Sequence, residues 1–187
     1  MIVDGKDMKP IWLDETSGRV KVIDQRELPH RLIIFDLDTV EKVVTAIKEM
    51  VVRGAPLLGV TAAYGVYVAL TSHPLDAGVE GYLKSSCRTI RAARPTAINL
   101  AYAVDKVLAK VLAVSSLDER IAAAQRAAGE LAGIETENCK MIGRHGVGLI
   151  ESISRKNKGR PVNILTHCNA GWLACIEYGT ATAPVYE

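Results

Sequence analysis

The sequence predicts an α+β domain, a small antiparallel meander plus a helical bundle, that leads into an incomplete α/β unit. Short β-branched runs alternate with turn residues over positions 10–35, and alanine- and valine-rich segments with helical periodicity continue through 38–153. One more apolar run, residues 162–165, follows near the carboxyl end. Because one strand and a partial helix cannot form a doubly wound sheet, we expect the α/β unit to be truncated.

The meander is expected from three runs of strand-forming residues with polar turn residues between the first two, at 11–13, 20–23 and 32–35. Asp38, followed three positions later by Glu41, resembles a capping pair and predicts the start of a helix that ends near Val52.

Further helix starts carry their own signals. Pro56 suits the first turn of a second helix, because a helix start leaves that N–H unpaired. Thr96 is expected to cap a helix over 97–114, and Ser116 with Glu119 forms a capping box. The remaining helices are expected over 79–93, from the capping box to about residue 132, and over 136–153, with Gly133 ending or kinking the chain between the last two.

The composition narrows the class of protein. The chain has 187 residues, of which 49% are hydrophobic and 24% charged, as in a globular protein with a sizeable core. A net charge of +2 provides no basic stripe, so we expect no nucleic-acid partner. There is no apolar run of about 18 residues and no signal-peptide core at the N-terminus, so we expect no membrane partner and a cytoplasmic location.

The four cysteines and four histidines do not suggest a metal centre. The cysteines lack C-x-x-C spacing and the histidines form no cluster, so neither a disulfide framework nor a zinc site is expected. Of the four, Cys87 and Cys139 fall in helical segments as packing residues, and Cys175 is expected in the core.

A polar, basic segment at 154–159 marks the expected boundary between a domain of residues 1–158 and an incomplete α/β domain in residues 159–187. The run 162–165 predicts a buried parallel strand that brings Cys168 to its carboxyl edge, where open α/β sheets bind ligands. Cys168 is then either a reactive thiol or a small packing residue. Asn169 is a candidate ligand contact, because its amide both donates and accepts hydrogen bonds.

Two arginines precede two predicted helix starts. Arg53 comes before Gly54, Ala55 and Pro56, and Arg94 comes before a proline and a threonine. A helix start offers free N–H groups and the positive end of the helix dipole, so each arrangement suits an anion. Both guanidinium groups could clamp one phosphate; alternatively, each could pair with carboxylates or carbonyls on the bundle surface.

Taken together, three segments closely resemble the methylthioribose-1-phosphate isomerase family, and they occur in the family's order. They are Val51-Val52-Arg53-Gly54-Ala55-Pro56-Leu57-Leu58-Gly59-Val60 with Ala62-Ala63-Tyr64-Gly65, then Arg94-Pro95-Thr96-Ala97-Ile98-Asn99-Leu100, then residues 164–171 with Tyr178-Gly179-Thr180-Ala181. The polar segment Asp24-Gln25-Arg26-Glu27-Leu28-Pro29 also resembles the family's N-terminal part.

The resemblance implies an aldose–ketose isomerase of methionine salvage that converts 5-methylthioribose 1-phosphate to 5-methylthioribulose 1-phosphate without a cofactor or metal. It implies a homodimer with a Rossmann-like C-terminal domain, of which this chain would hold only the truncated beginning. Carried over by motif, Cys168 would be catalytic, and Arg53, Gly54, Ala55 and Arg94 would bind the substrate phosphate.

One departure from the family affects this expectation. The family's catalytic aspartate lies further along the C-terminal domain, and this sequence has no aspartate after Asp118. We therefore expect an inactive fragment whose C-terminal half is a covalent or proteolysed partner. Two alternatives stay open: a ribose-1,5-bisphosphate isomerase, and a non-catalytic regulatory subunit resembling those of translation initiation factor 2B.

Overall fold

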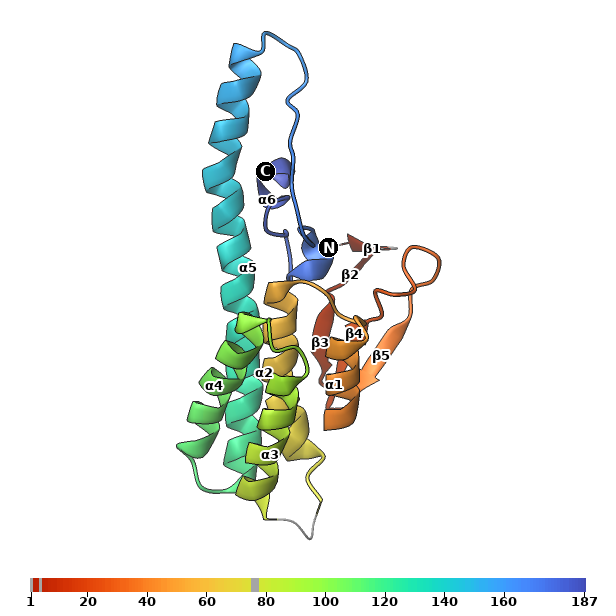
Figure 1. The fold of residues 1–187 in the computed structure, drawn as a ribbon, viewed down its shortest axis with the longest axis vertical. Coiled ribbons are helices and arrows are strands. Elements are labelled where there is room, and N and C mark those ends of the chain that lie inside the picture. Colours follow the sequence, from red (N-terminus) through yellow and green to blue (C-terminus); the bar gives the residue numbers. More distant parts are fainter. Residues whose placement is uncertain (1, 4, 75–77) are drawn as a thin grey trace.

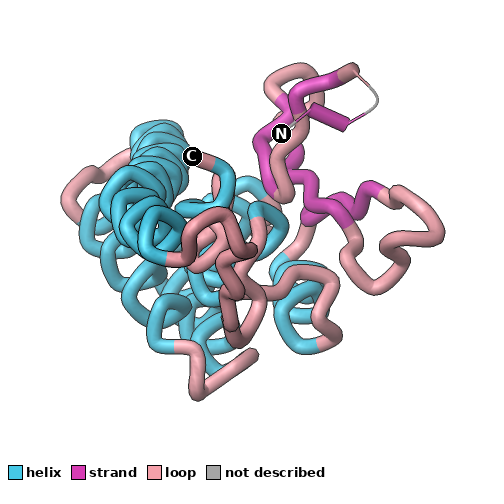
Figure 2. The backbone as a smooth tube through the Cα atoms, turned by 90° about the horizontal axis from the view of Figure 1, so that it is seen from above, coloured by secondary structure: helices cyan, strands magenta, loops and turns pink. Residues whose placement is uncertain are grey.

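The computed structural model describes residues 2–3, 5–74 and 78–187 (Figure 1). Its strands are β1 (Ile2–Val3), β2 (Lys6–Asp7), β3 (Ile11–Asp14), β4 (Arg19–Ile23) and β5 (Ile34–Leu37). Its helices are α1 (Val40–Lys48), α2 (Ala55–Thr71), α3 (Val79–Ala92), α4 (Ile98–Leu112), α5 (Leu117–Lys156), the short 3-10 helix η1 (Trp172–Ala174) and α6 (Ala183–Tyr186). The strands lie to one side of the helices (Figure 2).

The predicted meander is confirmed as a three-stranded antiparallel sheet in the order β3-β4-β5. Ile11 pairs with Val22, and Val20 pairs with Leu37, so the buried side chains of neighbouring strands lie opposite each other. This alternation buries one face of the sheet and fixes its register. The two-residue hairpin of β1 and β2 was not predicted, because strands this short have no periodicity to detect.

The first helix has a different cap from the one expected. The side chain of Thr39, rather than that of Asp38, accepts the hydrogen bond from the Lys42 N–H. Asp38 instead forms an ion pair with the Lys42 ammonium at 2.8 Å. The helix ends at Lys48, before the expected Val52, and the residues that follow turn toward the start of α2.

Helix α2 is buried along almost its whole length and forms the centre of the bundle. Its glycines explain how neighbouring elements approach so closely. An added Cβ at Gly59 would lie 3.2 Å from the Asn99 carbonyl oxygen of α4, and one at Gly65 would lie 2.9 Å from side-chain carbons of Val43 and Ile90. The glycines therefore have the packing role that offsets their low helix propensity.

The start of α4 differs from the prediction. The helix begins at Ile98, its N-cap is Ala97, and no side chain caps it, so Thr96 is not the cap. The cause is a turn over the preceding residues, in which the Ala97 N–H donates to the Arg94 carbonyl at 3.0 Å. Helix α3 ends at Ala92, within one residue of the expected position.

The two helices expected beyond Ser116 are one continuous helix, α5, of 40 residues. The capping box of Ser116 and Glu119 at its start is confirmed. The predicted break at Gly133 was wrong, because a glycine weakens a helix by only about 1 kcal/mol and the helix continues through it. At Gly143 and Gly146 the absence of a side chain lets α6 pack closely, as an added Cβ would meet Ala183 and Pro184.

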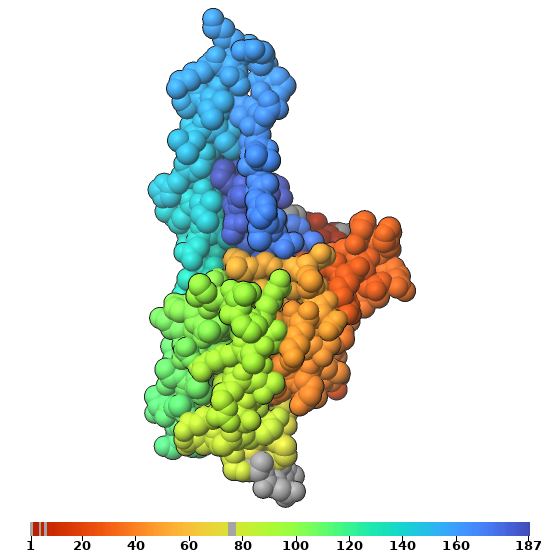
Figure 3. All heavy atoms as spheres, in the orientation of Figure 1, coloured from red at the N-terminus to blue at the C-terminus, as the bar shows by residue number. Residues whose placement is uncertain are grey.

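The strand expected at 162–165 is also absent. Residues 160–167 have no regular secondary structure, and Leu165 is 99% exposed. A parallel strand needs a neighbouring strand for its hydrogen bonds. Over the described residues every pairing involves β1 to β5, so this segment has none. Figure 3 shows it beside the outer half of α5, above the bundle.

The helices of the described ranges do not include one that could cross a lipid bilayer, because none combines sufficient length with sufficient apolarity.

Asp24 supports the turn that follows β4. It is 3% exposed, and its carboxylate accepts hydrogen bonds from the Arg26 backbone N–H at 3.0 Å and from the Arg26 guanidinium at 2.9 and 2.7 Å. The guanidinium of Arg26 lowers the pKa of the Asp24 carboxyl below its ordinary value, although burial opposes this.

This depressed pKa predicts an acid-dependent loss of stability. Since the carboxyl is more acidic in the folded state, its contribution is complete above about pH 4 and is lost as the pH falls through the lower folded-state pKa. We expect Asp24→Asn to lower the free energy of unfolding by about 1–3 kcal/mol at neutral pH. Urea denaturation over a pH series should show this gap narrowing in acid; a gap independent of pH would contradict the assignment.

Candidate functional site

The start of α2 lies directly against η1. Gly54 is the N-cap of α2 and has a φ of +100°. An added Cβ there would lie 2.5 Å from the carbonyl oxygen and 2.6 Å from the Cα of Ala174. Only glycine combines this backbone conformation with so close a contact. Ala55 follows as the first, exposed residue of the helix, and Pro56 lies in its first turn as predicted.

Gln25 connects Arg53 to the same loop. The Arg53 guanidinium Nη2 donates to the Gln25 carbonyl at 2.8 Å, and the Gln25 side-chain amide donates to the Leu173 carbonyl at 2.6 Å. Gln25 is buried. In the sequence Gln25 is one residue of a polar segment, and this role was not predicted. The only indication of this role in the sequence was the position of Gln25 in the motif at 24–29. No local pattern shows that a side-chain amide will be buried.

One nitrogen of Arg53 is left without a partner. Its Nε is buried and forms no hydrogen bond within the part of the chain that the structure describes. Since buried polar groups are nearly always satisfied, a donor in this position is available to an acceptor that is not part of these residues.

Residues 168–182 form a compact loop that carries Cys168. The Ala170 carbonyl accepts hydrogen bonds from the Thr180 N–H at 3.0 Å and from the Thr182 hydroxyl at 2.8 Å. Gly179, with a φ of +88°, lets the chain close, because a Cβ there would lie 2.5 Å from the same carbonyl. These contacts hold together the two ends of the loop.

Cys168 lies at the beginning of this loop with an exposed side chain and a φ of +73°. Few residues other than glycine adopt this left-handed conformation, which is often found at functional positions. Asn169 is also exposed. The structure therefore presents both side chains at the surface, in a segment that pairs with none of the strands in the described part of the chain.

Arg94 lies half-buried in the turn between α3 and α4. Helices α2 and α4 begin at the same end of the bundle (Figure 1), and Gly59 of α2 packs against Asn99 of α4. Arg53 and Arg94 thus precede two neighbouring helix starts that face the same end of the molecule.

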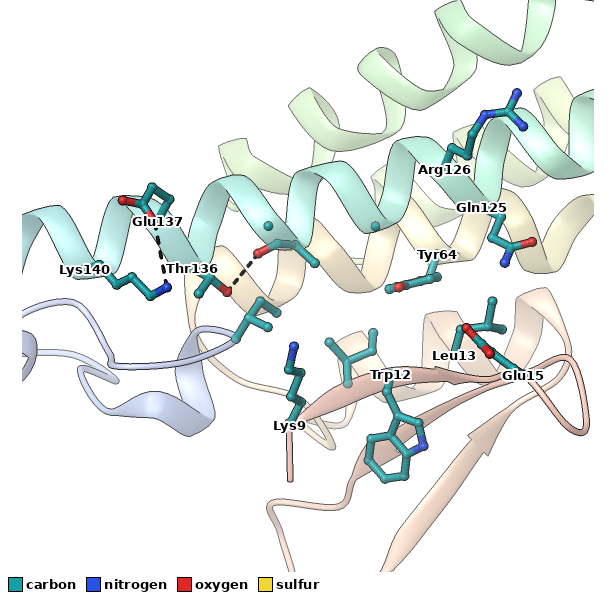
Figure 4. A pocket seen from close by; sticks show the side chains of 15 residues that line it. Lys9, Trp12, Leu13, Glu15, Tyr64, Gln125, Arg126, Thr136, Glu137 and Lys140 are labelled. Atoms are coloured by element: carbon teal, nitrogen blue, oxygen red, sulfur yellow. Dashed lines mark hydrogen bonds and ion pairs between the residues drawn. The ribbon is translucent and has the colours of Figure 1, made fainter. Parts of the chain in front are cut away.

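A separate hollow of about 620 Å³ lies between β3 and α5 (Figure 4). Lys9, Trp12 and Glu15 come from the strand side, and Gln125 and Lys140 come from α5. None of the site residues predicted from the sequence is part of its lining. Its ammonium groups have carboxylates nearby, since Lys9 lies 4.0 Å from Glu177 and Lys140 lies 3.9 Å from Glu137. The hollow, which Tyr64 of α2 also lines, is therefore distinct from the predicted site residues at the start of α2.

Comparison with known proteins agrees with the motifs. A model described as "Initiation factor 2 subunit family" matches residues 51–183, which include the start of α2 and the whole loop at 168–182. The chain belongs to this family. As a member of the Initiation factor 2 subunit family, it has relatives among curated proteins that align with nearly all of its length.

Two of these relatives carry the name methylthioribose-1-phosphate isomerase. The protein of Desulfosudis oleivorans is 52% identical over 98% of this chain and 50% of its own length. The protein of Desulfatibacillum aliphaticivorans is 50% identical over 100% of this chain and 51% of its own length. The resemblance predicted from the motifs is therefore confirmed, and the chain spans about half the length of the curated relatives it matches.

Two solved structures are similar in fold to this chain. Translation initiation factor eIF-2B subunit delta from A. fulgidus aligns with a TM-score of 0.80 at 31% identity, over 96% of this chain and 50% of its own. The 5-methylthioribose 1-phosphate isomerase of Pyrococcus horikoshii aligns with a TM-score of 0.75 at 29% identity, over 95% of this chain and 48% of its own. They share the fold of this sheet and bundle.

Proposed function

We propose that this chain is the N-terminal part of an aldose–ketose isomerase that converts 5-methylthioribose 1-phosphate to 5-methylthioribulose 1-phosphate in methionine salvage. The observation that carries the proposal is the contact between Gly54 and Ala174, which brings the start of α2 against the loop that bears Cys168. The isomerase names of relatives that align with nearly the whole chain support it.

In this proposal the substrate phosphate lies at the start of α2. The N–H groups of the first helical turn and the helix dipole attract an anion, and Ala55 leaves the approach open. Arg53 supplies a guanidinium whose buried Nε has no acceptor among the described residues, and an anion bound nearby can provide one. Arg94 contributes a second positive charge from the start of α4, with Asn169 as a further contact.

Cys168 is the proposed catalytic residue. Since the anomeric oxygen of the substrate carries phosphate, ring opening needs acid assistance, and a further group must manage the hydrogen that moves between C1 and C2. The exposed thiol at the edge of the loop is available for the second task.

We further propose that a second domain, the Rossmann-like C-terminal half, completes the site and forms a homodimer. Ile164 and Leu165 are exposed in a segment without strand partners, and the outer half of α5 exposes Leu149 and Ile153. Apolar groups on a surface of this kind are typically covered by another domain or chain. In the proposed boundary, residues 1–158 form the first domain, residues 159–187 begin the second, and the enzyme is cytoplasmic.

Calorimetric titration of this chain with 5-methylthioribose 1-phosphate tests the phosphate site. We expect binding without turnover, and Arg53→Ala and Arg94→Ala should each weaken it about tenfold or more, because a hydrogen bond to a charged group contributes about 1.5–3 kcal/mol. Arg155→Ala, on the outer end of α5, is the control and should leave the affinity unchanged. Equal affinities for all four proteins would contradict the proposed site, and turnover near that of a complete isomerase would contradict the fragment.

A second candidate function is that of a non-catalytic regulatory subunit, favoured by the TM-score of 0.80 to the eIF-2B delta subunit. Parallel titrations with a nucleotide and with ribose 1,5-bisphosphate separate the possibilities. Preferential binding of the nucleotide would favour the regulatory subunit. Preferential binding of the bisphosphate would favour a ribose-1,5-bisphosphate isomerase.

A further inference from the structure

Two cysteine thiols are in contact in a small buried cluster apart from the main core. Cys139 of α5 is 1% exposed and Cys175, which follows η1, is 0% exposed. They pack together with Ala174, and Tyr178 covers the cluster. The pair therefore joins the long helix to the loop at 168–182.

The contact makes the two thiols chemically different. The neighbouring Cys175 thiol lowers the pKa of Cys139, although burial and the nearby Glu135 oppose this. The neighbouring Cys139 thiol and burial raise the pKa of Cys175. Since the thiolate is the reactive form of cysteine, Cys139 is the better nucleophile of the two.

A metal does not explain the pair. Within residues 2–3, 5–74 and 78–187 no group of three or more histidine, cysteine, aspartate or glutamate side chains is arranged to hold an ion. Two thiols in contact without a metal have oxidation to a disulfide as their shared chemistry.

We propose that Cys139 and Cys175 are an oxidisable pair that forms a disulfide within the chain. With an azodicarboxamide oxidant such as diamide, the Cys139 thiolate adds to one nitrogen of the N=N bond. The Cys175 sulfur then attacks the Cys139 sulfur and displaces that nitrogen. The S–S bond forms as both thiol protons and two electrons pass to the oxidant, which becomes a hydrazine.

The disulfide would link the loop at 168–182 covalently to α5 through Cys175, the residue after Ala174. Because Ala174 contacts Gly54, the cross-link also holds η1 against the start of α2. It further restricts the unfolded chain, so the oxidised protein should have the higher Tm. This inference concerns the two thiols alone and does not depend on the proposed substrate.

The experiment uses the Cys168→Ser chain, in which the exposed thiol that could link two molecules is removed. Three of the four thiols then remain, and the third, Cys87, is an internal control, because burial in the main core raises its pKa to about 11. After treatment of the folded protein with diamide, we expect one free thiol in denaturant and a mass lower by two hydrogen atoms. Peptide mapping without reductant should recover Cys139 linked to Cys175.

The matched variant Cys168→Ser/Cys139→Ser should keep both of its thiols after the same treatment. Three free thiols in the oxidised Cys168→Ser chain, or a cross-link that includes Cys87, would overturn the proposal. The peptide map of the Cys168→Ser chain decides the matter even where the double variant fails to fold, because it identifies the linked residues directly.

Discussion

Gly54→Ala is expected to lower the free energy of unfolding by about 3–5 kcal/mol. Two effects combine at this position. The φ of +100° is unfavourable for any residue with a Cβ, and the new methyl group would overlap the backbone of Ala174, which cannot move aside as a flexible side chain could. Urea denaturation followed by circular dichroism measures the change.

Gly159→Ala is the matched control for this prediction. Gly159 has a similar φ of +83°, but an added Cβ there would meet nothing within 4 Å. This variant should therefore show the backbone effect alone, about 1–2 kcal/mol. Equal losses in the two variants would mean that the contact between α2 and η1 contributes nothing measurable.

Truncating two leucines, one buried and one exposed, should give the next largest difference in the free energy of unfolding. Leu57 is 0% exposed in the first turn of α2, and Leu165 is 99% exposed. We expect Leu57→Ala to lower the free energy of unfolding by about 2–5 kcal/mol, because it removes buried surface and leaves a cavity. Leu165→Ala should change it by less than about 0.5 kcal/mol.

The same urea denaturation measures both variants. The comparison tests the absence of the strand expected at 162–165. If Leu165→Ala were as destabilising as Leu57→Ala, the segment 162–165 would be buried in solution, as the sequence predicted.

The elements that the sequence predicted well are those determined by local chemistry. The turn residues between β3 and β4 and the alternation in both strands identify the hairpin, and the hydroxyl of Ser116 with the carboxylate of Glu119 defines the start of α5. Pro56 marks the first turn of α2 for the same reason. In each case the deciding contacts lie within a few residues along the chain.

The errors arose where distant contacts decide the outcome. Residues 162–165 have the composition of a strand, but a strand forms only beside another, and that pairing cannot be inferred from the segment itself. Gly133 suggested a break, yet the apolar face of α5 continues on both sides of it. Thr96 is a good capping residue, but the preceding turn makes Ala97 the N-cap of α4. Thr96 therefore lies one position too early in the chain to cap this helix.

The candidate site divides in the same way. The position of Arg53, Gly54 and Ala55 at a helix start was predicted from a local pattern, a cation and a glycine before that start, and their binding role stays a prediction. The role of Gln25 was missed, because its two partners, Arg53 and Leu173, are 28 and 148 positions away in the sequence. A contact between segments so far apart becomes visible only in three dimensions.

The 40 residues of α5 have a mechanical consequence. The helix extends about 60 Å, and its inner half is embedded in the bundle while its outer half projects beyond it (Figure 3). Such a rod acts as a lever about 30 Å long, so a tilt of about 10° at the bundle would swing its tip by about 5 Å. A small rearrangement of the inner turns of α5 therefore produces a larger displacement of the residues that follow Lys156.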